Sequence, residues 1–170
     1  MLVRLFSTTM LILATTGCRS SGGGDIGFHG YNLKYEALGE QRKFAKLGAT
    51  GTSVVCFVGN ELLSKQFTQP NLGQRFIQLL LDDTRSAAYE EDSLLASTDK
   101  VVFCENLDPC VYPSFEIQAA SSLPPLLWTF SLNPDIELTP ESQELVDLFL
   151  QVYEECRTEG EPYQPPSDEG

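Results

Sequence analysis

Histidine is nearly absent from this chain of 170 residues, in which His29 is the single example. A Ser-His-Asp or Cys-His catalytic site would have to use His29, and no Gly-x-Ser-x-Gly motif provides a nucleophile. Zinc sites of mixed cysteine and histidine lack ligands for the same reason. We therefore expect no catalytic residues, no metal site and no cofactor, and we predict that the protein is not an enzyme.

The sequence also lacks the loops that bind phosphate or calcium. Gly22–Gly24 belongs to a polar segment, and Gly48–Gly51 precedes an apolar run instead of following one. Carboxylates cluster at Asp82–Asp83, Glu90–Asp92 and Glu154–Glu155, without the alternating spacing of a calcium loop. We interpret these clusters as solvent-exposed helix faces. Paired carboxylates also leave a carboxylate-dependent envelope hydrolase as an alternative.

Positive charge is scarce, with 11 Lys and Arg against 24 Asp and Glu and a net charge of −13. Such acidity repels phosphate backbones, so nucleic acid is excluded as an expected partner. Most of the acidic residues follow residue 76, whereas basic residues lead between Cys18 and Gly48. The gradient predicts a strongly acidic distal surface, which serves either solubility or the binding of a partner.

No apolar run near the N-terminus approaches the roughly 20 residues that span a bilayer. Residues 5–16 instead form a shorter apolar stretch behind Arg4, typical of a secretory signal, which ends in Ala14-Thr15-Thr16-Gly17-Cys18. These residues resemble the lipobox of bacterial lipoproteins, in which small residues and Gly precede a Cys that receives a diacylglycerol. The chain departs from the usual lipobox at Thr15, where leucine is common.

The lipobox resemblance implies that residues 1–17 are a signal peptide and that Cys18 becomes the acylated N-terminus of the mature protein. Residues 18–27, which include Gly22–Gly24, are then expected to form a flexible tether. By analogy with Gram-negative lipoproteins, Arg19 in place of aspartate after the lipidated cysteine implies the outer membrane. We expect a lipid-anchored protein of the bacterial cell envelope that faces the periplasm.

Four further cysteines are expected to form two disulfides, since an exported chain meets an oxidising compartment. Four cysteines allow three connectivities. Cys104 and Cys110 flank a predicted turn at residues 105–109, which favours a local bridge and leaves Cys56 to pair with Cys156. The rival interpretation is a redox pair, but the chain contains no Cys-x-x-Cys motif.

Strands are predicted by apolar runs and by alternation of apolar and polar residues. The predicted strands lie around residues 28–35 and at residues 53–59, 100–104, 111–119 and 126–132. The run at residues 53–59 is apolar on both faces, which predicts a strand buried on both sides. Pro113 cannot donate to a sheet, so its strand is expected at an edge or to start after it.

Helices are predicted from capping residues and from apolar stripes. Asn71 is expected to cap a helix that reaches Asp83, with residues 86–95 either continuing it or forming a second helix. Thr139, Pro140 and Glu141 predict the start of a helix whose apolar stripe runs through Leu145, Leu148, Phe149, Val152 and Cys156. A short helix is predicted at residues 40–47, and residues 159–170 are expected to be a disordered acidic and Pro-rich tail.

The order of these elements predicts an α+β fold, a mostly antiparallel sheet with helices packed on one face and stapled by disulfides. Residues 28–158 are expected to form a single globular domain. The helix between the strands of Cys56 and Cys104 also allows a crossover that would make those two strands parallel.

Phe57-Val58, Leu62 and Leu72-Gly73-x-Arg75 resemble the strand-to-helix segment of outer-membrane lipoproteins of flagellar basal bodies, and the resemblance is confined to this segment. We expect a non-enzymatic interaction or accessory subunit that binds an envelope protein through its acidic distal surface. The alternative is a periplasmic small-ligand-binding lipoprotein with a pocket lined by Trp128, Phe130 and the N-terminal aromatic residues.

Overall fold

The domain consists of an antiparallel sheet and three helices in the part of the chain that the structure describes. The structure, a computed structural model, describes residues 30–68, 71–98, 113–120 and 126–165. The elements follow the order β1 (Gly30–Glu36), β2 (Lys43–Gly48), β3 (Ser53–Val58), β4 (Glu61–Gln66), α1 (Leu72–Leu80), α2 (Ser86–Thr98), β5 (Ser114–Ala119), β6 (Leu127–Ser131), α3 (Pro140–Glu159) and β7 (Glu161–Pro162).

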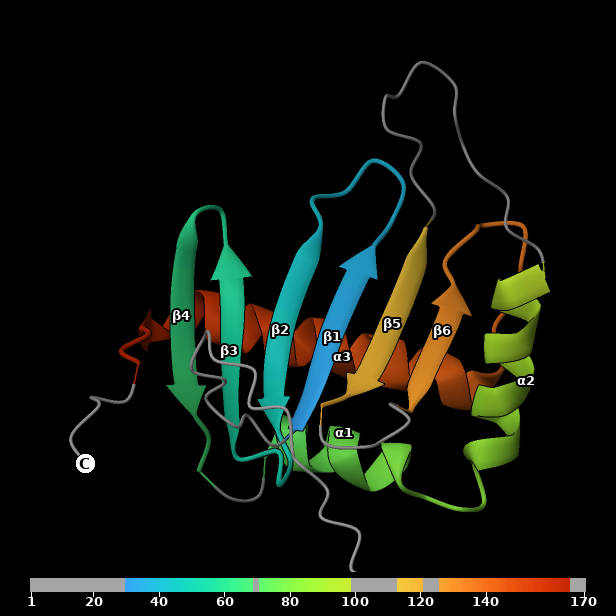
Figure 1. The fold of residues 1–170 in the computed structure, drawn as a ribbon, viewed down its shortest axis with the longest axis horizontal. Coiled ribbons are helices and arrows are strands. Elements are labelled where there is room, and N and C mark those ends of the chain that lie inside the picture. The colour runs from blue at the N-terminus through green and yellow to red at the C-terminus, as the bar shows by residue number, and fades with distance from the viewer. Residues whose placement is uncertain (1–29, 69–70, 99–112, 121–125, 166–170) are drawn as a thin grey trace, which may run out of the picture.

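The seven strands form one sheet in the order β6-β5-β1-β2-β3-β4-β7 (Figure 1). All six described strand pairs are antiparallel. Strands β1 to β4 form a meander of local hairpins, and β5 then pairs with β1 from far along the chain. The central strand of the sheet is therefore β2.

Glycines make two of the meander turns possible. Gly59 has a φ of 61° in the two-residue turn between β3 and β4, a conformation that residues with a Cβ rarely adopt. Gly51, with a φ of 69°, lies in the turn between β2 and β3 and touches the backbone of Gly73 at the start of α1. This close approach seats α1 against the end of the sheet.

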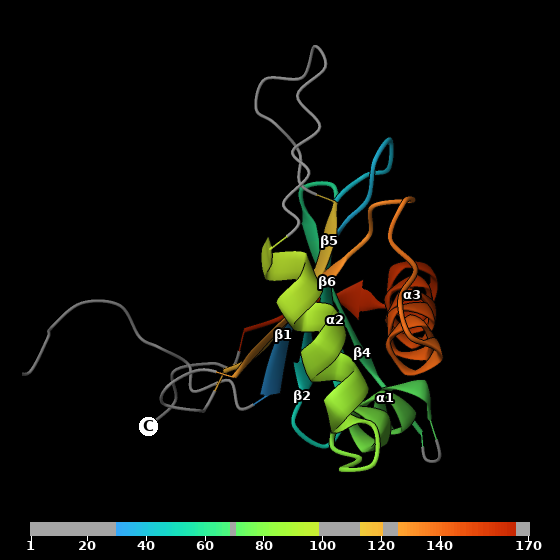
Figure 2. The same cartoon turned by 90° about the vertical axis from the view of Figure 1, so that its right-hand side faces the viewer.

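Helices cover one face of the sheet. Helix α3 crosses behind the strands in Figure 1, α1 lies on the same side, and α2 stands beside the edge strand β6 (Figure 2). Within the described ranges, no helix or strand covers the opposite face, which we call the open face. The predicted fold class, a mostly antiparallel α+β sheet with helices on one face and a disulfide, is confirmed.

Helix α3 begins and buries the side chains that the sequence predicted. The Thr139 side chain accepts a hydrogen bond from the backbone N–H of Ser142, Pro140 occupies the first turn, and Glu141 lies near the positive end of the helix dipole. Phe149 is buried completely, with ring centroids of Tyr35, Phe115 and Tyr153 between 4.9 and 6.2 Å away. Burial of one such side chain is worth about 1.5–3 kcal/mol.

Helix α2 is tied to both neighbouring helices by buried polar groups. The Tyr89 hydroxyl donates to the Leu79 carbonyl of α1 at 3.0 Å. The carboxylate of Asp92, only 3% exposed, accepts hydrogen bonds from the backbone N–H and the hydroxyl of Thr139. One member of the Glu90–Asp92 cluster is therefore structural, although the sequence had suggested only an exposed helix face.

The helix predicted at residues 40–47 is wrong, because Lys43–Gly48 forms strand β2. Ala45 and Leu47 point into the core, whereas Phe44 and Lys46 lie on the open face, which is the two-residue period of a strand. Pairing with β1 and β3 on both sides outweighs the local helical preference of this segment.

Three strand predictions also change. Strand β3 lies inside the sheet but is buried on one side, since Phe57 on its open side is 40% exposed. Strand β5 starts directly after Pro113, as predicted, yet it lies between β6 and β1 and not at an edge. Strand β6 spans Leu127–Ser131, one residue shorter at each end than the predicted range, and Leu126 before it is 56% exposed.

The boundary expected at residue 158 is wrong as well. Helix α3 continues to Glu159, and Glu161–Pro162 forms β7, which pairs with the centre of β4. Residues 166–170 of the predicted tail lie outside the described residues, as do the predicted signal peptide, the tether, the strand at residues 100–104 and the turn at 105–109.

Candidate functional site

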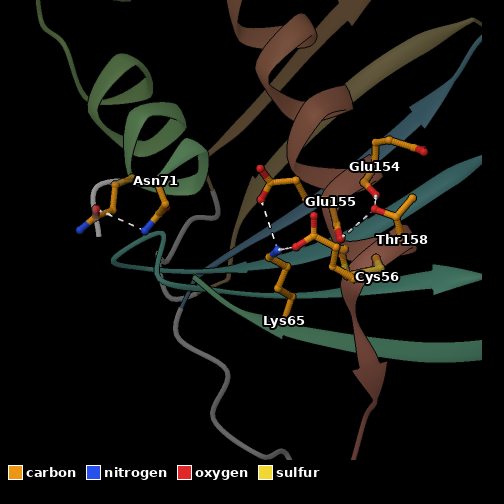
Figure 3. Close-up of polar contacts among 9 residues, drawn as sticks. Cys56, Lys65, Asn71, Glu154, Glu155 and Thr158 are labelled. Carbon is orange, nitrogen blue, oxygen red and sulfur yellow. Dashed lines mark hydrogen bonds and ion pairs between the residues drawn. A yellow bond between two sulfur atoms is a disulfide. The ribbon is translucent and has the colours of Figure 1, made fainter. Parts of the chain in front are cut away.

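A cleft of about 600 Å³ opens where the end of β4 meets α1 and α3 (Figure 3). Its polar groups come from three elements and surround one lysine. The residues that line it are Lys65, Gln66, Phe67, Thr68, Asn71, Leu72 and Glu155.

Three polar side chains of this cleft, those of Lys65, Asn71 and Glu155, are already engaged within the domain. The Lys65 ammonium lies 2.5 Å from the Glu159 carboxylate and 3.6 Å from that of Glu155, and 5.5 Å from the ring centre of Phe67. The hydrogen bond to Glu159, followed by the two carboxylate charges, raises the pKa of Lys65. The side-chain oxygen of Asn71 accepts a hydrogen bond from the backbone N–H of Gln74. The arrangement joins β4 to α3.

A disulfide lies beside the ion pairs of Lys65 and joins β3 to α3. Cys56 and Cys156 are bonded, with both residues fully buried. The predicted pairing of these two cysteines is confirmed. Because no solvent reaches either residue, the bond is a structural staple of the last helix and not an exposed redox pair.

A second cleft, of about 280 Å³, lies at the opposite end of α3. Tyr35, Asn133, Gln143 and Asp147 supply its polar groups. The Asn133 side chain accepts from the backbone N–H of Asp135, and the Gln143 amide donates to Asp147. Burial, followed by the charge of Glu40, raises the pKa of the Tyr35 phenol. These groups stabilise the loop between β6 and α3 and do not converge on a common point.

The open face carries a row of side chains that runs across six strands. The partners lie directly opposite one another in the order Thr129, Glu116, Lys34, Phe44, Phe57 and Leu62. Phe57 is 40% and Leu62 38% exposed, and the rings of Phe44 and Phe57 meet edge to face at 6.4 Å. The row is therefore apolar over β2 to β4 and charged over β1 and β5.

A shallow groove of about 210 Å³ follows β1 on this face. Phe44 and Phe57 form one wall, Glu116, Gln118 and Leu127 form the other, and Asn32, Lys34 and Lys46 lie between or beside them. Lys34 reaches Glu116 at 3.0 Å and Glu36 at 3.7 Å, and Arg42 also pairs with Glu36. The charges of the open face thus occur as neighbouring pairs of opposite sign.

Charge differs sharply between the two sides of the sheet. The strands place Lys34 and Lys46 on the open face against Glu36 and Glu116, which is a balanced set. Helices α2 and α3 carry one base, Arg157, against the nine acids Glu90, Glu91, Asp92, Glu141, Glu144, Asp147, Glu154, Glu155 and Glu159, and Lys65, Arg75 and Arg85 pair with three of these acids from neighbouring segments. Negative charge is therefore in excess on the surface formed by α3, behind the sheet, and α2, beside its edge, which we call the helix side (Figure 2).

Several carboxylates of the clusters noted in the sequence are engaged by separate partners. Asp82 accepts from the backbone N–H and the hydroxyl of Thr84, contacts that lower its pKa. Glu154 pairs with Arg157, and Glu155 turns towards Lys65. Asp82, Asp92, Glu154 and Glu155 thus each contact a different partner within the domain, and the alternative of a carboxylate-dependent hydrolase gains no support from this geometry.

The hypothetical ligand pocket around Trp128 and Phe130 is not formed by Phe130. That ring is fully buried, stacks on Phe115 at 5.9 Å and meets Tyr89 edge-on at 6.3 Å. Neither Trp128 nor Phe130 lines any of the three clefts described above. Phe130 belongs to the core.

Several predicted site residues lie outside the described residues. They are the lipidation site Cys18, the lone histidine His29 and the predicted pair Cys104–Cys110. Among the described residues, no group of three or more His, Cys, Asp or Glu side chains is placed to hold a metal ion. None of the described helices has the length and apolar character needed to cross a bilayer. No known protein family, curated protein or solved structure matches this chain.

The apolar row of the open face was missed by the sequence reasoning. Phe44 had been assigned to a helix, and β4, which carries Leu62, had not been predicted at all. The dipeptide Gly59-Asn60 between two apolar segments is a hairpin signal that would have revealed β4 and its register with β3.

Proposed function

We propose that this protein is a lipid-anchored, non-enzymatic interaction subunit of the bacterial cell envelope that binds a basic partner protein through its helix side. The observation that carries the proposal is the segregation of charge across the sheet. The acids lie on α3, behind the sheet, and on α2, beside its edge, while the charges on the open face balance (Figure 2). A domain tethered near its N-terminus, close to β1, is free to present the helix side to a partner.

The acids that remain available lie mainly on α2 and on the middle of α3. Glu144 is engaged by Arg75 and Arg85, Glu154 by Arg157, and Glu155 and Glu159 by Lys65. Glu90 and Glu91 are exposed and have no ion pair within the described part of the chain. They are the side chains through which the helix side would attract a basic surface.

The lipid anchor is tested by the substitution Cys18→Ala in the full chain, expressed in a Gram-negative host. The acylated protein is expected to fractionate with outer membranes, and the variant to appear in the soluble periplasmic fraction. The anchor would be refuted if the Cys18→Ala variant stayed in the membrane fraction, or if the intact mass of the mature wild-type chain showed no fatty acid.

The partner surface is tested by charge reversal followed by crosslinking in intact cells and mass spectrometry. Glu90→Lys with Glu91→Lys is expected to abolish recovery of the specific crosslinked partner. The matched control is Glu61→Lys with Glu161→Lys, which changes the net charge equally at the exposed β4–β7 edge. Equal partner recovery from both double variants would show that the helix side is not the binding surface.

A further inference from the structure

The open face has the properties of a contact between two copies of the domain. Phe44, Phe57 and Leu62 align across β2 to β4, and two of the three are more than a third exposed. We propose that a second copy of this chain packs on the open face, so that the two sheets form the inner layers of a dimer and the helices its outer layers.

The charges of the face are arranged so that it can face a copy of itself. Lys34 lies 3.0 Å from Glu116 and 3.7 Å from Glu36, and Arg42 also pairs with Glu36, so these positive groups have negative neighbours within the same copy. A two-fold axis that runs across the strands, parallel to the sheet, places β2 to β4 over the same strands of the second copy. The apolar parts then meet each other, and the charges around β1 and β5 enter the contact as ion pairs already formed within each copy, Lys34 with Glu116 and Glu36 and Arg42 with Glu36, so that no cluster of one sign is buried.

Charge also selects this face over the rest of the surface. Two copies that met through the helix side would bring two layers of excess carboxylates together, which costs free energy. Contact through the open face keeps those layers on opposite outer sides of the dimer. It also leaves both acidic layers free, so the dimer does not depend on the proposed partner binding.

The sheet edges offer little room for the alternative of edge-to-edge pairing. Helix α2 stands beside β6, and β7 pairs with the centre of β4 through Glu161 and Pro162 (Figure 1, Figure 2). Proline at an edge cannot donate a ladder hydrogen bond, which blocks extension of the sheet there. Association of two sheets is therefore directed to the face.

The area of the open face is sufficient for a stable contact. With strands about 4.8 Å apart and a rise of about 3.4 Å per residue, six strands of five to seven residues cover roughly 600 Å². Two copies would therefore bury about 1,200 Å², which lies at the lower end of specific protein interfaces. Aligned packing of two twisted sheets is a common arrangement of such layers.

The first test measures the mass of the full chain in mild detergent by sedimentation equilibrium. The wild-type chain is expected to dimerise, and Phe57→Glu to raise the dimer dissociation constant at least about tenfold. Leu62→Glu is expected to act similarly and serves if Phe57→Glu fails to fold. The matched control is Leu81→Glu, which places the same charge on a 60% exposed leucine at the end of α1 and should leave dimerisation unchanged.

The second test asks in cells what lies on the face. A photoreactive phenylalanine analogue at position 57, in two differently tagged full chains expressed together, is expected to yield a crosslinked product that carries both tags. A wild-type chain that stays monomeric, a dimer that survives both glutamate variants, or a crosslink to a different protein alone would overturn the proposal. Loss of partner binding in the α2 charge reversal, by contrast, leaves the dimer mass unchanged.

Discussion

The covered and the open face of the sheet are built from the same strands but serve different purposes. In β3, Val54 and Cys56 point towards the helices and are at most 1% exposed, whereas Phe57, the next residue, is 40% exposed. Both faces are apolar at this point, so hydrophobicity alone does not tell them apart. The difference lies in what covers each face, and helices supply that cover on one side.

This difference separates residues that stabilise the fold from residues that are available for binding. On the covered face an apolar side chain is surrounded by neighbours from α1 and α3, and its removal leaves a cavity. On the open face, shortening an apolar side chain creates little or no cavity, because the side chain is already partly exposed to water. Substitutions on the two faces should therefore separate stability from association.

The largest effect is expected from removal of the bond that fastens the covering helix to the sheet. The double substitution Cys56→Ala with Cys156→Ala opens a loop of 100 residues and should lower the free energy of unfolding by about 4–5 kcal/mol. Urea denaturation of both proteins measures the change. A loss below about 1 kcal/mol would mean that packing alone holds α3 in place.

A direct comparison of the two faces uses one residue type on each. Phe149→Ala, in the core under α3, should cost about 3–5 kcal/mol because a fully buried ring is lost. Phe57→Ala, on the open face, should change the stability of the monomer by no more than about 0.5 kcal/mol. Both values come from chemical denaturation at a protein concentration below the dimer dissociation constant. Equal losses at the two positions would contradict the distinction between the faces.

A smaller effect on stability is expected at the contact between the start of α1 and the turn that joins β2 to β3. A Cβ at position 73 would lie 2.3 Å from the backbone oxygen of Gly51, and neither backbone can move freely. Gly73→Ala should therefore cost about 1–3 kcal/mol, although alanine favours a helix. Gln78→Ala on the exposed side of α1 is the control and should be nearly neutral. An increase in stability on Gly73→Ala would show that α1 shifts at no cost.

The smallest effect concerns the ion pairs that join α1 and the start of α2 to α3. Hydrogen bonds from Arg85 and then from Arg75 lower the pKa of Glu144. A lowered carboxyl pKa contributes stability above the unfolded value of 4.5, and this contribution is lost as the pH falls through the lower folded value.

Glu144→Gln should therefore destabilise the domain at neutral pH by less than about 1 kcal/mol, since the side chain is 37% exposed. The difference from wild type should shrink as the pH falls below the unfolded value of 4.5 and through the lower folded value. Urea denaturation at neutral and at acidic pH measures it. A difference that persists at low pH would assign the effect to packing instead of charge.

Elements with strong local signals could be predicted from the sequence. The start of α3 has a capping threonine, a proline and an acid in successive positions, and its apolar stripe recurs at helical spacing. Asn71 marks the start of α1 in the same way. Cys156 lies on the stripe of α3 and Cys56 in an apolar strand, which was sufficient to predict their bond once the other two cysteines had been paired locally.

The secondary structure between residues 40 and 66 was predicted less completely from the sequence. β2 has helix-compatible residues and becomes a strand because β1 and β3 hydrogen-bond to it on both sides. The open face is hidden for a related reason, since the run at residues 53–59 is apolar on both sides whether one side or both are covered. The ion partners of the carboxylates come from residues up to 94 positions away and leave no local trace.

By itself the sequence determined the α+β class, the caps and buried stripe of the last helix, the disulfide across the domain and the excess of negative charge. These features follow from local backbone preferences and from composition. Tertiary structure alone decided that Lys43–Gly48 is the central strand, that Phe44, Phe57 and Leu62 line up on the face that no described helix covers, and that the acids gather on α2 and α3. Strand order and layer packing join residues far apart in the chain, and only the folded sheet shows which of its two faces remains open.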